Sequence, residues 1–130
     1  MRVRRFEDLE CWKEARVLTK RVYEITSRKA MAKDDRLRGQ MTGAAISVMN
    51  NIAEGFDSGV RTELLRFLRY ARRSTSEVQT CLYVAADQSY LTPVEFESLY
   101  QQAPSTRKLI DGFVRYLRDS TGAPANRRTG

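Results

Sequence analysis

The chain has 130 residues, of which 42% are hydrophobic, and its 23 basic and 16 acidic side chains give a formal net charge of +7. This length suits one domain with one core, and the apolar content argues against wholesale disorder. Histidine is absent, which removes the commonest general base and metal ligand and excludes a Ser–His or Cys–His nucleophile within one chain.

The two cysteines and the hydropathy pattern limit the chain further. Cys11 and Cys81 form no CxxC pair and are predicted to be reduced core thiols, not a disulfide framework or a zinc site. No apolar run reaches the ~18 residues that a membrane span needs, and no apolar signal segment follows the basic N-terminus. We therefore expect a cytoplasmic protein with no membrane association, no metal and no cofactor.

The first helix is predicted from about Leu9 to Ser27, with Asp8 as a candidate N-cap. Its apolar positions alternate in steps of four and three, which places them in one stripe along a helix. They are Cys11, Ala15, Leu18, Val22 and Ile25.

A polar connection, residues 28–33, leads into the second helix, which Asp34 or Asp35 can cap and which runs to about Glu54. Gly39 and Gly43 each weaken this helix by ~1 kcal/mol relative to alanine. We interpret both as small residues that allow close helix approach, and Gly55 as the C-terminal stop. The main stripe consists of Leu37, Met41, Ala44, Val48, Asn51 and Gly55.

The third and fourth helices follow two further polar turns. The third is predicted over about Thr62–Ser89, because the three–four alternation of apolar positions continues along it. The fourth starts at a capping box formed by Thr92 and Glu95, with proline at the first helical position. Pro104 predicts a kink, or a break with a restart at Ser105, since proline removes a helical hydrogen bond.

These elements predict an all-α fold. Four helices of comparable length with short connections favour an antiparallel up-down-up-down four-helix bundle. The bundle is expected to occupy residues 1–121, and residues 122–130 are expected to form a flexible, basic C-terminal tail.

Several polar residues fall on or beside the apolar stripes. Burying them is costly unless they form hydrogen bonds, so a polar layer that fixes helix register is the favoured interpretation. A subunit contact and a catalytic pair of carboxylates, Glu54 with Glu77, are the alternatives. The residues are Ser47, Asn51, Glu54, Ser74 and Glu77.

Arginines are also patterned. They recur along the third helix around Tyr70 and at the start of the second helix, and they are the predicted nucleic-acid contacts because guanidinium groups bind phosphate and neighbouring rings can stack on bases. A solvated face paired with Glu63 and Asp111 is the competing interpretation. The predicted contacts are Arg66, Arg69, Arg72, Arg73, Arg36 and Arg38.

Short strings along the chain carry a resemblance to a known family. They are Phe6-Glu7-Asp8-Leu9 with Trp12 and Ala15, then Gln40, Ser47 and Asn51-Ile52-Ala53-Glu54-Gly55, then Arg66-Phe67-Leu68 with Ala71, Ser74 and Glu77, and Tyr90-Leu91. From Phe6 to about Leu117 the sequence resembles the four-helix-bundle family encoded by intervening sequences in bacterial 23S ribosomal RNA genes. Thr42 and Gly43 stand where that family often has arginines.

This resemblance implies a homopentameric, barrel-like assembly with no known enzymatic activity. It also implies a relation to the accessory proteins of reverse transcriptases in diversity-generating retroelements, which bind nucleic acid and the polymerase. We therefore expect a non-catalytic, oligomeric nucleic-acid-binding bundle with RNA as ligand. The alternatives are a protein-interaction scaffold, such as a reverse-transcriptase accessory subunit, and an enzyme that uses Glu54 and Glu77.

Overall fold

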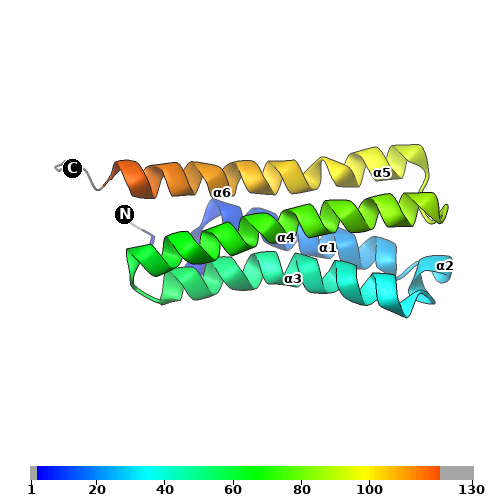
Figure 1. Cartoon of the computed structure of the whole chain (residues 1–130), viewed down its shortest axis with the longest axis horizontal. Coiled ribbons are helices and arrows are strands. Elements are labelled where there is room, and N and C mark those ends of the chain that lie inside the picture. The colour runs from blue at the N-terminus through cyan, green and yellow to red at the C-terminus, as the bar shows by residue number, and fades with distance from the viewer. Residues whose placement is uncertain (1–2, 121–130) are drawn as a thin grey trace.

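A computed structural model describes residues 3–120, and all regular secondary structure in this range is helical. Four long helical segments lie side by side and fit a bundle (Figure 1). The elements are the 3₁₀-helix η1 (Phe6–Asp8), α1 (Glu10–Thr26), α2 (Lys29–Ala32), α3 (Asp35–Asp57), α4 (Arg61–Asp87), α5 (Pro93–Tyr100) and α6 (Gln102–Asp119).

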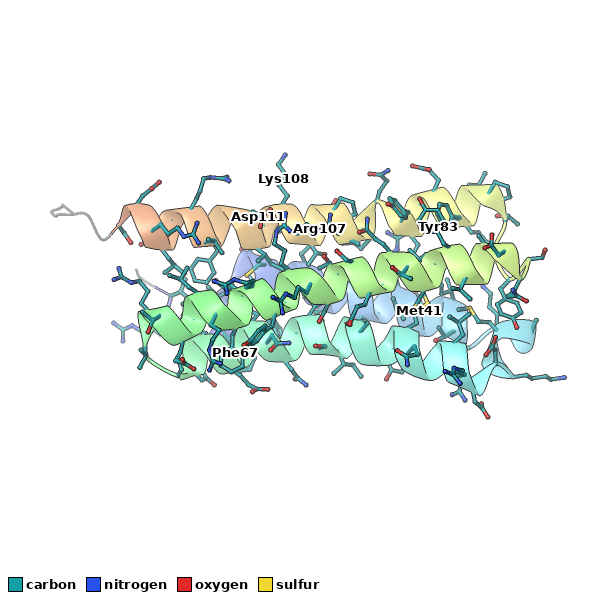
Figure 2. All side chains as sticks on the ribbon, viewed as in Figure 1. Met41, Phe67, Tyr83, Arg107, Lys108 and Asp111 are labelled. Carbon is teal, nitrogen blue, oxygen red and sulfur yellow. The ribbon has the colours of Figure 1, made fainter. Side chains whose placement is uncertain are left out.

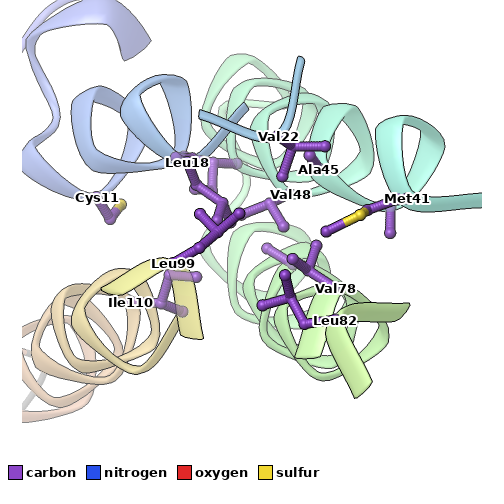
Figure 3. Close-up of a cluster of buried hydrophobic side chains, with 14 of the residues drawn as sticks. Cys11, Leu18, Val22, Met41, Ala45, Val48, Val78, Leu82, Leu99 and Ile110 are labelled. Atoms are coloured by element: carbon purple, nitrogen blue, oxygen red, sulfur yellow. The ribbon is translucent and has the colours of Figure 1, made fainter. Parts of the chain in front are cut away.

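The apolar stripes meet along the axis of the bundle. α3 packs against α1 and α4, and α6 packs against α4 and α1, so each long helix has two long neighbours. Side chains from all four segments fill the space between them (Figure 3). Each fully buried leucine, isoleucine or valine stabilises the fold by about 1.5–3 kcal/mol. Those with no exposed surface include Leu18, Val22, Val48, Ile52, Leu68, Val78, Leu82 and Ile110.

The connection before α3 contains a short helix that the sequence analysis missed. α2 places Met31 in the core with 1% of its surface exposed, and this apolar anchor orders a stretch predicted as a polar connection. Asp34 caps α3, since its Oδ1 accepts from Leu37 N at 3.1 Å. Its Oδ2 accepts from the Tyr90 hydroxyl at 3.0 Å, which fixes the start of α3 to the connection after α4.

Two predicted helix ends are wrong. Asp8 lies in η1, and α1 follows Leu9 without a side-chain cap. Gly55 does not stop α3, because the helix continues to Asp57 and Gly55 is buried. A Cβ at Gly55 would lie 2.7 Å from Phe67 Cβ and 3.3 Å from Leu64 Cα, so this glycine allows the close approach of α4.

The interpretation of the other two α3 glycines is wrong as well. A Cβ at Gly39 or Gly43 would meet nothing within 4 Å, so neither permits a close contact inside the described bundle. Both are exposed. The role of close approach therefore belongs to Gly55.

The last helical segment starts as predicted and breaks earlier than predicted. Thr92 Oγ1 accepts from Glu95 N at 3.1 Å, and Glu95 Oε1 accepts from Thr92 N at 2.9 Å, which confirms the capping box. The break falls at Gln101, and α6 begins at Gln102 instead of Ser105. Pro104 has no N–H to donate to the carbonyl four residues earlier, so the interruption appears on its N-terminal side.

The predicted C-terminal tail, residues 122–130, lies outside the described residues. Among the helices of residues 3–120, none combines the length and the apolar character that crossing a membrane requires.

Candidate nucleic-acid interface

The outer side of α4 carries three exposed arginines around one tyrosine. Arg66, Arg69 and Arg73 recur in steps of three and four. The guanidinium carbons of Arg66 and Arg73 each lie 5.7 Å from the centroid of the Tyr70 ring. Arg66 Nη1 also donates to the Tyr70 hydroxyl at 3.3 Å. These cation–π contacts order the arginine face while its charges remain in solvent.

The arginines of this face differ in their partners. Arg66 Nη2 donates to Glu63 Oε1 at 2.6 Å, and this hydrogen bond, with the one to Tyr70, raises the pKa of Arg66. Arg69 and Arg73 form no ion pair with any other residue in the 3–120 range. An exposed ion pair contributes only about 0–1 kcal/mol, so a phosphate can compete with Glu63 for Arg66.

Arg72 lies on a different side of α4 from these three arginines. Its Nε donates to Asp111 Oδ1 of α6 at 2.8 Å. Arg72 therefore bridges α4 and α6. This agrees with the competing interpretation from the sequence, in which arginines of a solvated face pair with residues such as Asp111.

Arg36 and Arg38 lie in the first turns of α3, which starts at the opposite end of the bundle from α4 (Figure 1). Arg38 Nη2 donates to Asp35 Oδ1 at 2.6 Å. Arg36 lines a shallow hollow with Gln40 and Glu77. Arg38 lines a different hollow, since two residues correspond to about 200° around the helix. The six predicted arginines thus occupy four separate places, and only Arg66, Arg69 and Arg73 share one face.

A hydrogen-bonded polar cluster lies between α3 and α4. Ser74 Oγ donates to Ser47 Oγ at 3.0 Å, and Asn51 Nδ2 donates to the Ser47 hydroxyl at 3.0 Å and to its carbonyl at 2.8 Å. Ser74 is 6% exposed, whereas Ser47 and Asn51 are half-buried. The cluster lies at the edge of the core, where its hydrogen bonds compensate for the loss of water.

The two glutamates assigned to this layer are not in it. Glu54 and Glu77 are both exposed, so their placement on an inward face was wrong. Each follows a fully buried residue, Val48 or Ala71, by six positions, which corresponds to a turn of roughly 120° around the helix away from the core.

The seam between α4 and the α5–α6 segment holds groups that the predicted site did not include. Tyr83 of α4 packs against Phe96 and Tyr100 of α5, with ring centroids 5.1 and 5.6 Å apart. Arg107 of α6 donates from Nε to Thr75 Oγ1 at 3.0 Å. The aromatic residues are visible in the sequence, but no local pattern there indicates that α4 and α5 bring them together.

The thiols and carboxylates of the described chain form no metal-binding constellation. Both cysteines are free, Cys11 being buried and Cys81 half-buried, and burial raises the pKa of Cys11 to about 12. Within residues 3–120, no group of three or more histidine, cysteine, aspartate or glutamate side chains is placed to hold a metal ion.

Comparison with known proteins gives one family and one fold. The family model described as 23S rRNA-intervening sequence protein matches residues 7–112. A crystal structure of a protein of unknown function from the S23 ribosomal protein family of Bacteroides thetaiotaomicron superposes with a TM-score of 0.72 at 18% identity. The match covers 80% of this chain and 97% of that one. None of the curated proteins is similar to the chain at a significant level.

Proposed function

Because the chain belongs to the 23S rRNA-intervening sequence protein family, we propose that it is a non-catalytic, oligomeric helical bundle that binds RNA. The observation that carries the proposal is the exposed arginine face of α4, formed by Arg66, Arg69 and Arg73 around Tyr70. These arginines neutralise phosphates on a rigid helical surface. RNA binding of this kind depends on backbone charge and releases counterions.

The proposed subunit is an antiparallel up-down-up-down bundle, which the short connections after α3 and α4 support. Rigid helices fix the arginine face, so binding costs little conformational entropy beyond that of the side chains. The proposal assigns no reaction, since histidine is absent from the sequence and Glu54 and Glu77 are exposed on the outside of their helices.

Assembly multiplies this charge. Five chains of +7 carry +35, so modest contacts from each subunit sum to useful avidity. The middle of the outer side of α3 supports such an assembly, because between Arg36 and Glu54 its outward positions are small or uncharged along about four turns and Ile46 is 37% exposed. The positions are Gly39, Gly43, Ile46, Asn50 and Ala53.

A salt series with fragments of 23S ribosomal RNA tests the binding. Affinity is expected to fall linearly on a log–log plot against salt, with a slope of about −0.7 to −0.9 per phosphate contact. The Arg69→Gln/Arg73→Gln double variant should weaken binding and reduce that slope by roughly two contacts. The Arg16→Gln/Lys20→Gln double variant removes the same charge from the exposed side of α1. It should retain a higher affinity and a steeper salt slope than the Arg69→Gln/Arg73→Gln variant. Affinity that stays flat between low and moderate salt would overturn the proposal.

Light scattering tests the assembly separately. Five chains of 15.0 kDa give a mass of about 75 kDa. A particle of one-chain mass at micromolar concentration would remove the oligomeric part of the proposal and leave RNA binding to be judged on its own.

A further inference from the structure

The seam between α4 and α5 presents an aromatic cluster to solvent. Tyr83 is 53% exposed, although its ring contacts Phe96 and Tyr100. Phe96 and Tyr100 stack on each other with centroids 5.4 Å apart and planes inclined by 28°. The two inner rings therefore support Tyr83 from below and leave part of its surface free.

The positively charged side chain of Arg107 lies farther along the same seam. Figure 2 shows Tyr83, Arg107 and Asp111 following one another between α4 and the α5–α6 segment. Arg107 Nε donates to Thr75 Oγ1 at 3.0 Å, and its Nη2 donates to Gln79 Oε1. Thr75 has no exposed surface, so the hydroxyl that orients the guanidinium is fixed.

The charge of Arg107 is not compensated in the way that the charge of Arg72 is. Arg72 Nε donates to Asp111 Oδ1 at 2.8 Å, whereas both ligands of Arg107 are neutral and no ion pair joins it to any other residue in the described range. A guanidinium oriented by neutral acceptors, with Nη1 without a hydrogen-bond partner in residues 3–120, suits an anionic oxygen.

We propose that this seam binds single-stranded RNA, with the exposed ring of Tyr83 stacking on an unpaired base and Arg107 contacting a phosphate of the same strand. This inference rests on the RNA binding proposed above and specifies the form of RNA. In a duplex the bases are paired and stacked, so a protein ring can reach them only in single-stranded segments. An aromatic platform beside a cation is the combination that single-stranded binding uses.

The spacing of the two groups suits a short strand. Gln79 and Thr75, which hold Arg107, precede Tyr83 by four and eight residues on α4, or about 6 and 12 Å at 1.5 Å per residue. At ~3.4 Å per nucleotide, the spacing of a strand that keeps duplex-like stacking, that span corresponds to roughly two to four nucleotides. Tyr83 and Arg107 can therefore contact neighbouring parts of one strand at the same time.

The test compares a labelled 12-nucleotide oligouridine with a blunt 12-base-pair RNA duplex by fluorescence anisotropy at low salt. Tyr83→Leu keeps an apolar cover on Phe96 and removes the stacking ring. It should weaken single-strand binding by about 5- to 150-fold, the range for loss of one base–aromatic stack, and leave duplex binding unchanged. Tyr83→Phe should bind like the unmodified chain. Tyr23→Leu is the matched control. Tyr23 is exposed to a similar extent, 49%, but lies on α1 away from the seam.

Arg107→Gln tests the phosphate contact. It should weaken binding of the oligouridine and reduce its salt slope by about 0.7, the value for one contact to a single strand. Arg16→Gln serves as the charge control on α1. Tyr83→Trp enlarges the stacking face and should tighten single-strand binding, which keeps the test decisive if Tyr83→Leu does not fold.

The outcomes separate the two proposals. If the unmodified chain binds neither RNA, the proposed function fails and this inference fails with it. If the chain binds RNA but neither Tyr83→Leu nor Tyr83→Trp changes single-strand affinity, only the stacking platform is refuted, and the aromatic cluster then serves packing or a protein partner.

Discussion

The outer sides of α3 and α4 differ sharply, although the two helices are close neighbours. The outer side of α3 is uncharged between Arg36 and Glu54, with Gly39 and Gly43 leaving open space around the helix. The outer side of α4 carries the exposed arginines Arg69 and Arg73. A small, uncharged surface can be buried against protein at low desolvation cost, whereas a row of guanidinium groups cannot. The contrast supports the proposal that subunits assemble through α3 and bind RNA through α4.

The largest effect is expected from placing a charge on the outer side of α3. Gly43→Glu should convert a particle of about 75 kDa into one of about 15 kDa in light scattering, because burying an unpaired carboxylate at a subunit contact is costly. The subunit should stay folded, since a Cβ at Gly43 meets nothing within 4 Å.

Thr80→Glu is the matched control for this test. Thr80 is exposed on the outer side of α4, so the same carboxylate there should leave the assembly intact. An unchanged mass for Gly43→Glu, measured on folded protein, would show that the outer side of α3 is not the subunit contact.

The next effect concerns the contact between α3 and α4. Gly55→Ala should destabilise the fold by about 1–3 kcal/mol, because the new Cβ would lie 2.7 Å from Phe67 Cβ and overpack the helix contact. Gly39→Ala should stabilise the fold by up to ~1 kcal/mol, since alanine is the better helix former and nothing lies within 4 Å. Chemical denaturation measures the free energy of unfolding of both variants. A change of the same sign in both would contradict the role given to Gly55 in the contact between α3 and α4.

These glycines also show how far the sequence predicts the fold. Periodicity identified the four long helical segments because apolar stripes such as Leu18 and Val22 reflect local helix geometry alone. It gave close helix approach to Gly39 and Gly43 instead of Gly55, because that role depends on whether Phe67 of another helix lies opposite. The same limit applies to Tyr83 and Arg107, whose partners on α4, α5 and α6 are brought together only by tertiary packing.

The misplacement of the glutamates has a different cause. Glu54 and Glu77 were grouped with Ser47 and Ser74 because three- and four-residue steps join them along each helix. A step of four and a step of three nearly cancel, so Glu54 lies only about 20° around the helix from Ser47, which is itself half-buried at the edge of the stripe. A single step of three turns the position by about 60°, which is enough to leave the stripe. Burial of Ser74 and exposure of Glu77, three residues later, follow from this rotation.

A smaller effect is expected from the polar cluster between α3 and α4. Ser74→Ala removes the hydroxyl that donates to Ser47 at 3.0 Å and should destabilise the fold by about 1 kcal/mol. Ser76→Ala, on the exposed side of α4, should stay within ±0.5 kcal/mol. Thermal unfolding of the two variants under one condition makes the comparison. Equal stability for both would mean that the Ser47–Ser74 hydrogen bond contributes nothing net.

The smallest change in stability is expected at the ion pair between α4 and α6. Asp111→Asn removes the carboxylate that accepts from Arg72 Nε at 2.8 Å. Both side chains are partly exposed, at 52% and 36% of their surface, so the pair is screened by water and its loss should cost less than ~1 kcal/mol. Binding should respond in the opposite direction, because the substitution raises the net charge from +7 to +8 and frees Arg72 beside Arg107.

We therefore expect Asp111→Asn to bind the 12-nucleotide oligouridine more tightly and with a salt slope steeper by up to one phosphate contact, about 0.7. Glu24→Gln on the exposed side of α1 makes the same change in net charge without releasing an arginine, so its slope should stay near that of the unmodified chain. If the two variants gain affinity equally, only the overall charge of the chain matters. RNA binding would then not be confined to one side of the bundle, contrary to what the contrast of α3 and α4 indicates. If Asp111→Asn alone gains a contact, the basic surface of α4 extends from its outer arginines into the seam with α6.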